Sequence, residues 1–341
     1  MPSKNSPGYG WGVVTLDADD LSACQSETLR NRVRRPSRIP PARTAKVAPE
    51  SPALPPNPEE QLRSASLVER LNALFTSPSY EPPLLPTAAM QLLEMSHCKT
   101  CSFADILKVL ESDPMVAARV LKVAQSPVYA GKAQIQSLEQ ALVRLGLHNL
   151  GDLFLQVTMT ARVFRARAYQ VQMEQQRRHA VATAHASRLV CRATALPDEY
   201  AFLCGLLHDV GFVAVLIALS EPNNGIRGPA GALPYDVVRD AAMAVHTHAG
   251  ALICDAWRLP QEVKLVVQHH HQPRINGIYH PMSTVVHLAD LLVTKYELSE
   301  PVVVDANVQA VRETVNISSR AWQNIEQTFH AQAKQLGLVR A

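Results

Sequence analysis

The chain has 341 residues, of which 47% are hydrophobic and 18% charged, so it holds enough apolar material for one large or two modest cores. Its formal net charge of +3 is too close to neutral for the whole chain to act as a polyanion-binding protein. No uninterrupted apolar run reaches the ~18–20 residues that span a bilayer, and the first residues lack the apolar core of a secretory signal, so we expect a cytoplasmic protein without a membrane span.

The first 64 residues differ in composition from the rest of the chain. They hold ten of the 24 prolines, and the stretch from Arg30 to Lys46 has seven basic residues and no acidic one. Within this segment the run SPALPPNPEE is expected to exclude helices and central strands, because proline lacks a backbone donor. We predict a disordered tail at residues 1–64, with weak contact to nucleic acid or to an acidic partner as the alternative.

From residue 65 onward, apolar residues recur with the period of an α-helix almost throughout the chain. Runs of β-branched residues between tight turns are few. We therefore predict an all-α fold that begins with a leading helix at residues 65–80. Three pairs have the spacing of helix N-terminal caps: Ser66 with Glu69, Ser102 with Asp105, and Ser137 with Gln140.

The six cysteines are scattered along the chain, as is usual for reduced thiols. Cys98 and Cys101 form one CxxC motif, but no second CxxC completes a zinc site, so we expect this pair to be chemically inactive. Cys191, Cys204 and Cys254 lie in apolar helical stretches, which predicts that they are core residues.

Residues 202–216, FLCGLLHDVGFVAVL, place a histidine and an aspartate inside an apolar run. Apolar residues fall on every side of the predicted helix, as they do in a buried helix. His208 and Asp209 therefore need partners, which are each other, further polar groups, or a metal ion. Ten of the 13 histidines fall between residues 179 and 287, as expected of a polar or metal site assembled from several helices.

A set of segments within residues 81–290 resembles the HDOD family, a bacterial signal-transduction domain related to HD phosphohydrolases. The segments are EPPLLPTAAMQLLEM, LESDPMVAARVLKVAQSPVYAG, IQSLEQALVRLGLHNLGDLF, FLCGLLHDVG, HTHAGALICDAWRLPQEV and QHHHQP. The resemblance implies a multi-helix HDOD fold with an N-terminal helical half at 81–165 and an HD-like half at 170–290. Residues 291–341 are expected to add a C-terminal helical extension.

Matched residue by residue, the resemblance implies a nearly complete set of metal ligands. The implied ligands are His179, His208, Asp209, His246, His270, His271 and Asp290. Imidazoles together with carboxylates suit Mn, Fe or another divalent metal such as Mg. His287 lies one helical turn before Asp290 and is predicted to orient it from outside the ligand set. A metal-free network of buried polar groups is the alternative.

Three positions depart from the hydrolytic relatives called HD-GYP proteins. Phe212 follows Gly211 where those relatives have a lysine, and Gln272 follows the double histidine where they have a glutamate. Their Gly-x-Gly-Tyr-Pro loop has only a partial counterpart here, NGIYHP at residues 276–281. The absent lysine would remove a phosphate-binding charge.

These departures favour a regulatory protein that acts through protein or ligand binding without efficient catalysis. The alternative is a metal-dependent phosphohydrolase or phosphodiesterase that acts on a nucleotide or cyclic nucleotide. The expected partners are signalling proteins or a small nucleotide ligand. A second copy of the chain is a further possible partner, because the last predicted helices are amphipathic.

Overall fold

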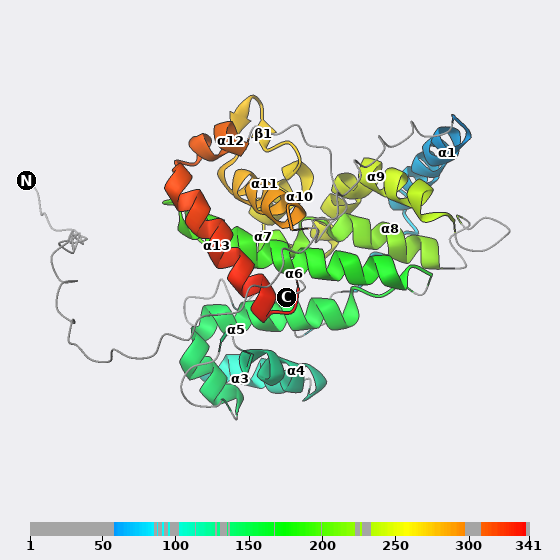
Figure 1. Cartoon of the computed structure of the whole chain (residues 1–341). Helices are drawn as coiled ribbons and strands as arrows, with labels where there is room; N and C mark the ends of the chain where they lie inside the picture. Colours follow the sequence, from blue (N-terminus) through cyan, green and yellow to red (C-terminus); the bar gives the residue numbers. More distant parts are fainter. Residues whose placement is uncertain are drawn as a thin grey trace, which may run out of the picture. The chain divides into compact units, whose positions relative to one another are not determined.

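The computed structural model of this chain describes residues 58–84, 102–112, 114–126, 137–166, 168–198, 200–221, 233–296 and 308–338, with single positions at 87, 91, 95, 128, 129, 135 and 226. Residues 1–57 of the predicted tail and the Cys98–Cys101 pair lie outside them. Within the described residues the chain forms twelve helices and one small hairpin (Figure 1), so the all-α prediction is confirmed. The elements are α1 (Pro58–Phe75), α3 (Phe103–Glu111), α4 (Pro114–Ala124), α5 (Leu138–Arg162), α6 (Gln170–Arg192), α7 (Ala201–Leu207), α8 (Val210–Ser220), α9 (Tyr235–Ala256), α10 (Gln261–His269), β1 (Arg274–Ile275), β2 (Ile278–Tyr279), α11 (Pro281–Thr294), α12 (Val308–Thr314) and α13 (Ser319–Gln335).

The helix starts follow two of the three predicted caps. Ser102 caps α3 in a reciprocal capping box with Asp105, and the hydroxyl of Ser137 caps α5. The prediction at Ser66 is wrong, because α1 already begins at Pro58 and Ser66 lies inside it. Proline is tolerated in the first turn of a helix, where its missing N–H has no intrahelical partner. Residues 58–64 of the predicted tail therefore belong to α1.

Two separate apolar cores organise the described residues. The first is built by α3, α4 and most of α5, with Leu110 and Phe154 fully buried in it. The second, larger core joins α1 to helices α6–α13. Helix α5 supplies side chains to both cores, and its backbone bends at Gly146, whose φ of 73° is readily adopted only by glycine.

The apolar run at residues 201–220 forms α7 and α8. Its length and mean hydropathy would suffice for a membrane span, contrary to our expectation, because its many apolar residues outweigh His208, Asp209 and Ser220. Most of the run is buried inside the second core, and a core helix passes the same test. The three cysteines predicted to be core residues, Cys191, Cys204 and Cys254, are buried free thiols.

The neighbours of α7 and α8 set the place of the polar residues between them. Helix α6 packs along α7 and α11, α8 packs along α9, and α10 contacts α7, α9 and α11 (Figure 1). The short hairpin β1–β2 joins the end of α10 to the start of α11. The junction of α7 and α8 is therefore enclosed by helices α6, α9, α10 and α11.

Candidate metal centre

His208 and Asp209 are the two residues that separate α7 from α8. The predicted single helix is broken here, since α7 ends at Leu207 and α8 begins at Val210. His208 is buried, whereas the Asp209 side chain keeps 15% of its surface exposed. The break turns both side chains toward the surrounding helices α6, α9, α10 and α11.

Two glycines bring these helices close enough for the polar side chains to meet. A Cβ atom at Gly205 would lie 2.6 Å from the main-chain carbonyl oxygen of Thr183, so α7 approaches the backbone of α6 directly. A Cβ atom at Gly211 would overlap the carbonyl oxygen of His246, so α8 approaches α9 in the same way. The flanking glycines of GLLHDVG thus determine the helix spacing around the HD pair.

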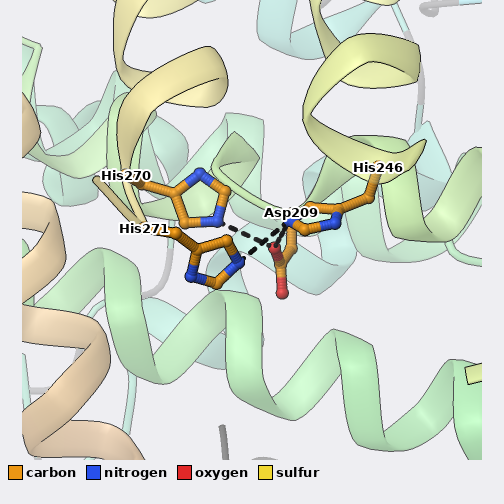
Figure 2. A group of neighbouring side chains, drawn as sticks. All are labelled: Asp209, His246, His270 and His271. Carbon is orange, nitrogen blue, oxygen red and sulfur yellow. Dashed lines mark hydrogen bonds and ion pairs between the residues drawn. The ribbon is translucent and has the colours of Figure 1, made fainter. Parts of the chain in front are cut away.

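The seven residues that the sequence implied as ligands lie together in the structure. Their donor atoms form two groups, each with all members within 4.8 Å of one another. The first group is His179, His208 and Asp290, and the second group is Asp209, His246, His270 and His271. Figure 2 shows the Asp209 carboxylate between the His246 ring and the rings of His270 and His271.

Asp209 faces both groups, with one oxygen toward each. Its Oδ1 atom lies 3.2 Å from Nε2 of His270 and 3.5 Å from Nε2 of His246. Its Oδ2 atom lies 3.6 Å from Nε2 of His208 and 3.7 Å from Nε2 of His179. The carboxylate is therefore placed to bridge two cations.

Three of the imidazoles are oriented by helix carbonyl groups. Their Nδ1 atoms lie within hydrogen-bond distance of carbonyl oxygens: His208 to Gly205 at 2.9 Å, His246 to Met243 at 2.9 Å, and His270 to Val267 at 3.1 Å. A carbonyl oxygen only accepts, so each Nδ1 must carry the proton. In the neutral ring the Nε2 atom then has a lone pair, the form that binds a metal.

The contact between His270 and Asp209 calls for a positive charge that the neutral form of the ring does not supply. Protons alone can satisfy two other contacts: Nε2 of His271 can donate to Nε2 of His246 at 3.0 Å, and the proton on Nε2 of His179 lies between Nε2 of His208 at 3.0 Å and Oδ1 of Asp290 at 3.2 Å. Nε2 of His270 is buried and makes no hydrogen bond to the residues that the structure describes, although it lies 3.2 Å from a carboxylate oxygen. A lone pair facing a carboxylate requires a cation between them, either a proton or a metal.

Burial and the two aspartates control the charge of the imidazoles. Burial lowers the pKa of His208 to about 4 and that of His271 to about 3, so both rings are neutral near pH 7. Burial also acts to lower the pKa of His179, but the hydrogen bond of its ring to Asp290 raises it overall. Burial opposes ionisation of Asp209, yet the nearby imidazoles, His208 foremost, hold the pKa of this carboxyl well below its usual range.

His287 lies beside the site but contacts a different group from the one that we predicted. Its Nδ1 atom lies 2.7 Å from the main-chain carbonyl oxygen of His270, and within the described residues it makes no hydrogen bond to Asp290. The sequence shows that His287 and Asp290 share a helix face, but it does not show that the carbonyl at the end of α10 points at this ring.

The family model of the HDOD domain matches residues 83–273. An uncharacterized protein from Treponema pallidum (strain Nichols) is 23% identical over an alignment of 242 residues, which covers 67% of this chain and 44% of that protein. The match therefore spans less than half the length of this relative.

Solved structures of 16–19% identity share the fold. A protein from Shewanella amazonensis SB2B, proposed to be a metal-dependent phosphohydrolase, has a TM-score of 0.60 at 16% identity over 79% of this chain and 99% of its own. An HDOD domain protein of unknown function from Geobacter sulfurreducens has a TM-score of 0.58 at 17% identity over 80% and 94%. A protein from Marinobacter aquaeolei VT8 proposed to act in signal transduction has a TM-score of 0.60 at 19% identity over 82% and 66%.

Proposed function

Because this chain belongs to the HDOD domain family, we propose that it is a signal-transduction protein whose HD-like half holds a pair of divalent metal ions. The observation that carries the proposal is the contact of His270 with Asp209. Nδ1 of His270 is bound to a carbonyl oxygen, and its buried Nε2 faces a carboxylate oxygen at 3.2 Å with no hydrogen bond within the described residues. A metal ion in the second group would supply the positive charge that this contact requires, and the donors of the first group offer a place for a second ion.

The donor set favours particular metals. The first group would hold one ion through His179, His208 and Asp290, the second group would hold another, and Asp209 would bridge both. Five imidazoles among seven donors suit first-row divalent metals such as Mn or Fe. Mg is disfavoured, because it prefers oxygen ligands and keeps much of its water.

The wall of the site beside the HD pair is apolar. Phe212 is 2% exposed, and its ring centroid lies 6.5 Å from that of His246. Within the described residues, neither Asp209 nor Asp290 forms an ion pair with a lysine or an arginine. Where the hydrolytic relatives have a lysine, Phe212 offers a phosphoester no positive charge, which favours a regulatory role for the metal site over efficient turnover.

A second candidate function is metal-dependent hydrolysis of a phosphoester such as a nucleotide or cyclic nucleotide. It is favoured by the gathering of all seven implied ligands and by the exposed edge of the Asp209 carboxylate. A metal pair activates water and stabilises negative charge on a phosphoryl group. Asp209 and the imidazoles of this chain would hold and orient that pair.

A regulatory HDOD protein would act by binding other molecules. We expect a cytoplasmic protein that contacts signalling proteins or a small nucleotide, with a second copy of the chain as a further partner. The basic stretch from Arg30 to Lys46 would add weak, salt-sensitive affinity for nucleic acid.

Elemental analysis after saturation with Mn²⁺, followed by a phosphodiester assay, separates these functions. Wild-type protein is expected to retain two ions per chain, and the double variant His208→Ala/Asp209→Ala to retain none. His248→Ala is the matched control, because His248 is exposed two residues from His246 and belongs to neither group. Metal without turnover supports the regulatory role, turnover lost in the double variant supports hydrolysis, and absence of metal in the wild type would refute both.

A further inference from the structure

We propose that His287 is a positioning residue that caps the C-terminal end of α10 and thereby fixes His270 and His271 in the second group. The inference rests on the metal site proposed above. It assigns a role to a side chain that belongs to neither ligand group. His287 lies on α11, one turn before Asp290. Its contact with the His270 carbonyl connects α11 to the end of α10.

The first step is the hydrogen bond itself. Nδ1 of His287 lies 2.7 Å from the main-chain carbonyl oxygen of His270, and the His287 side chain is buried at 3% exposure. The carbonyl only accepts, so Nδ1 of His287 must donate. The bond lies within the buried centre of the second core, where loss of the donor would leave the carbonyl unpaired.

The second step is the position of that carbonyl. Helix α10 ends at His269, and His270 is its C-cap residue. Carbonyl groups in the last turn of a helix have no partner within the helix and need one from elsewhere. A histidine from α11 meets this need here, at the residue whose own ring faces Asp209.

The third step links the cap to the ligand atoms. The His270 ring is tied through Nδ1 to Val267 on α10, and its main chain is tied to His287 on α11. His271 follows directly, with its Nε2 3.0 Å from Nε2 of His246. Loss of the cap would release the turn that carries two of the four donors in the second group.

The effect should be confined to the second group. Within the described part of the chain, His287 makes no hydrogen bond to His179, His208 or Asp290 of the first group. Moving the donor away from the His270 carbonyl should therefore weaken binding of the ion at the second group and spare the ion at the first group. If His287 only filled space, moving the hydrogen-bond donor along its side chain would not change metal binding.

Asparagine and glutamine provide a matched pair of variants. The amide nitrogen of asparagine is as many bonds from Cα as Nδ1 of histidine, whereas that of glutamine corresponds to Nε2. His287→Asn can donate to the His270 carbonyl, and His287→Gln places its donor one bond too far along the side chain. The two variants are both polar and uncharged, and they differ by the one methylene group that shifts the donor.

The experiment is a stepwise Mn²⁺ titration of the full chain against a chelating dye, with circular dichroism to confirm folding. We expect two binding steps in the wild type and in His287→Asn. In His287→Gln one step should weaken by about 10–100-fold, the usual cost of losing a partner that supports a ligand. The weakened step should be the one that is lost in His271→Ala, and the step lost in Asp290→Asn should stay unchanged.

Three results would overturn the assignment. They are unchanged binding in His287→Gln, equal weakening of both steps, and weakening in His287→Asn as large as in His287→Gln. If the wild type binds no Mn²⁺, the proposed metal site fails and this role fails with it. If the wild type binds two ions and only the His287 variants depart from expectation, the metal site stands and the positioning role is refuted.

Discussion

Replacing Gly211 with alanine should disturb the α8–α9 contact from which the second group is built. A Cβ atom at this position would overlap the carbonyl oxygen of His246 and lie 2.5 Å from the Gly250 nitrogen, whereas ordinary contact begins at 3.4 Å. The two helices must therefore separate by more than about 1 Å. Forcing extra atoms into a packed core costs about 1–3 kcal/mol, and the 3.5 Å distance from His246 to Asp209 would lengthen.

The assay is thermal unfolding with and without Mn²⁺. At about 2–4 °C per kcal/mol, Gly211→Ala should lower the Tm by about 2–12 °C, and the increase in Tm on adding Mn²⁺ should shrink. Gly151→Ala is the control, because a Cβ atom at this helical glycine meets none of the described residues within 4 Å and alanine is the better helix former. An unchanged Tm and an unchanged response to Mn²⁺ in Gly211→Ala would refute the role given to this close approach.

Three further predictions concern other parts of the structure. Arg188→Met should destabilise the protein by about 3–5 kcal/mol in urea unfolding, because it leaves the buried carboxylate of Asp152 without its ion-pair partner. Recovery of stability in the double variant Arg188→Met/Asp152→Leu would support this cause. The free energy of unfolding of the metal-free protein should fall as the pH drops from 6.5 toward 4. Burial lowers the pKa of His208 to about 4, so over this range the unfolded chain takes up a proton that the folded chain excludes. Urea titrations that give constant stability over this range would contradict the prediction. Ser137→Ala should cost about 1 kcal/mol in the same urea assay, because the hydroxyl that accepts from the Gln140 backbone N–H at the start of α5 is lost. Ser137→Asp keeps an acceptor there and should retain the wild-type stability. Equal losses of stability in the two variants would refute the capping role.

Periodicity was sufficient to predict the helical class but not every helix end. Ser102 and Ser137 were found because a cap depends on residues only three positions apart. Ser66 has the same spacing but lies inside α1. The apolar residues that follow it, Leu67 and Leu71, pack against the second core, and this packing does not fix where the helix begins. Local capping signals therefore do not exclude an additional turn before them.

The implied ligand set could be found from motifs, whereas its supporting contacts could not. His208 and Asp209 form an adjacent pair in an apolar run, and that conflict is visible in the sequence. The bond from His287 to the His270 carbonyl depends on where α10 ends and how α11 passes it, which is a tertiary property. Side-chain identity alone does not show which main-chain carbonyl groups need a partner.

Anomalous X-ray diffraction from crystals grown with Mn²⁺ would test the proposed metal pair most directly. We expect two anomalous peaks in each chain, one at the first group and one at the second group, with the Asp209 carboxylate between them. Crystals that contain Mn²⁺ but show no peak at either group would contradict the proposed site.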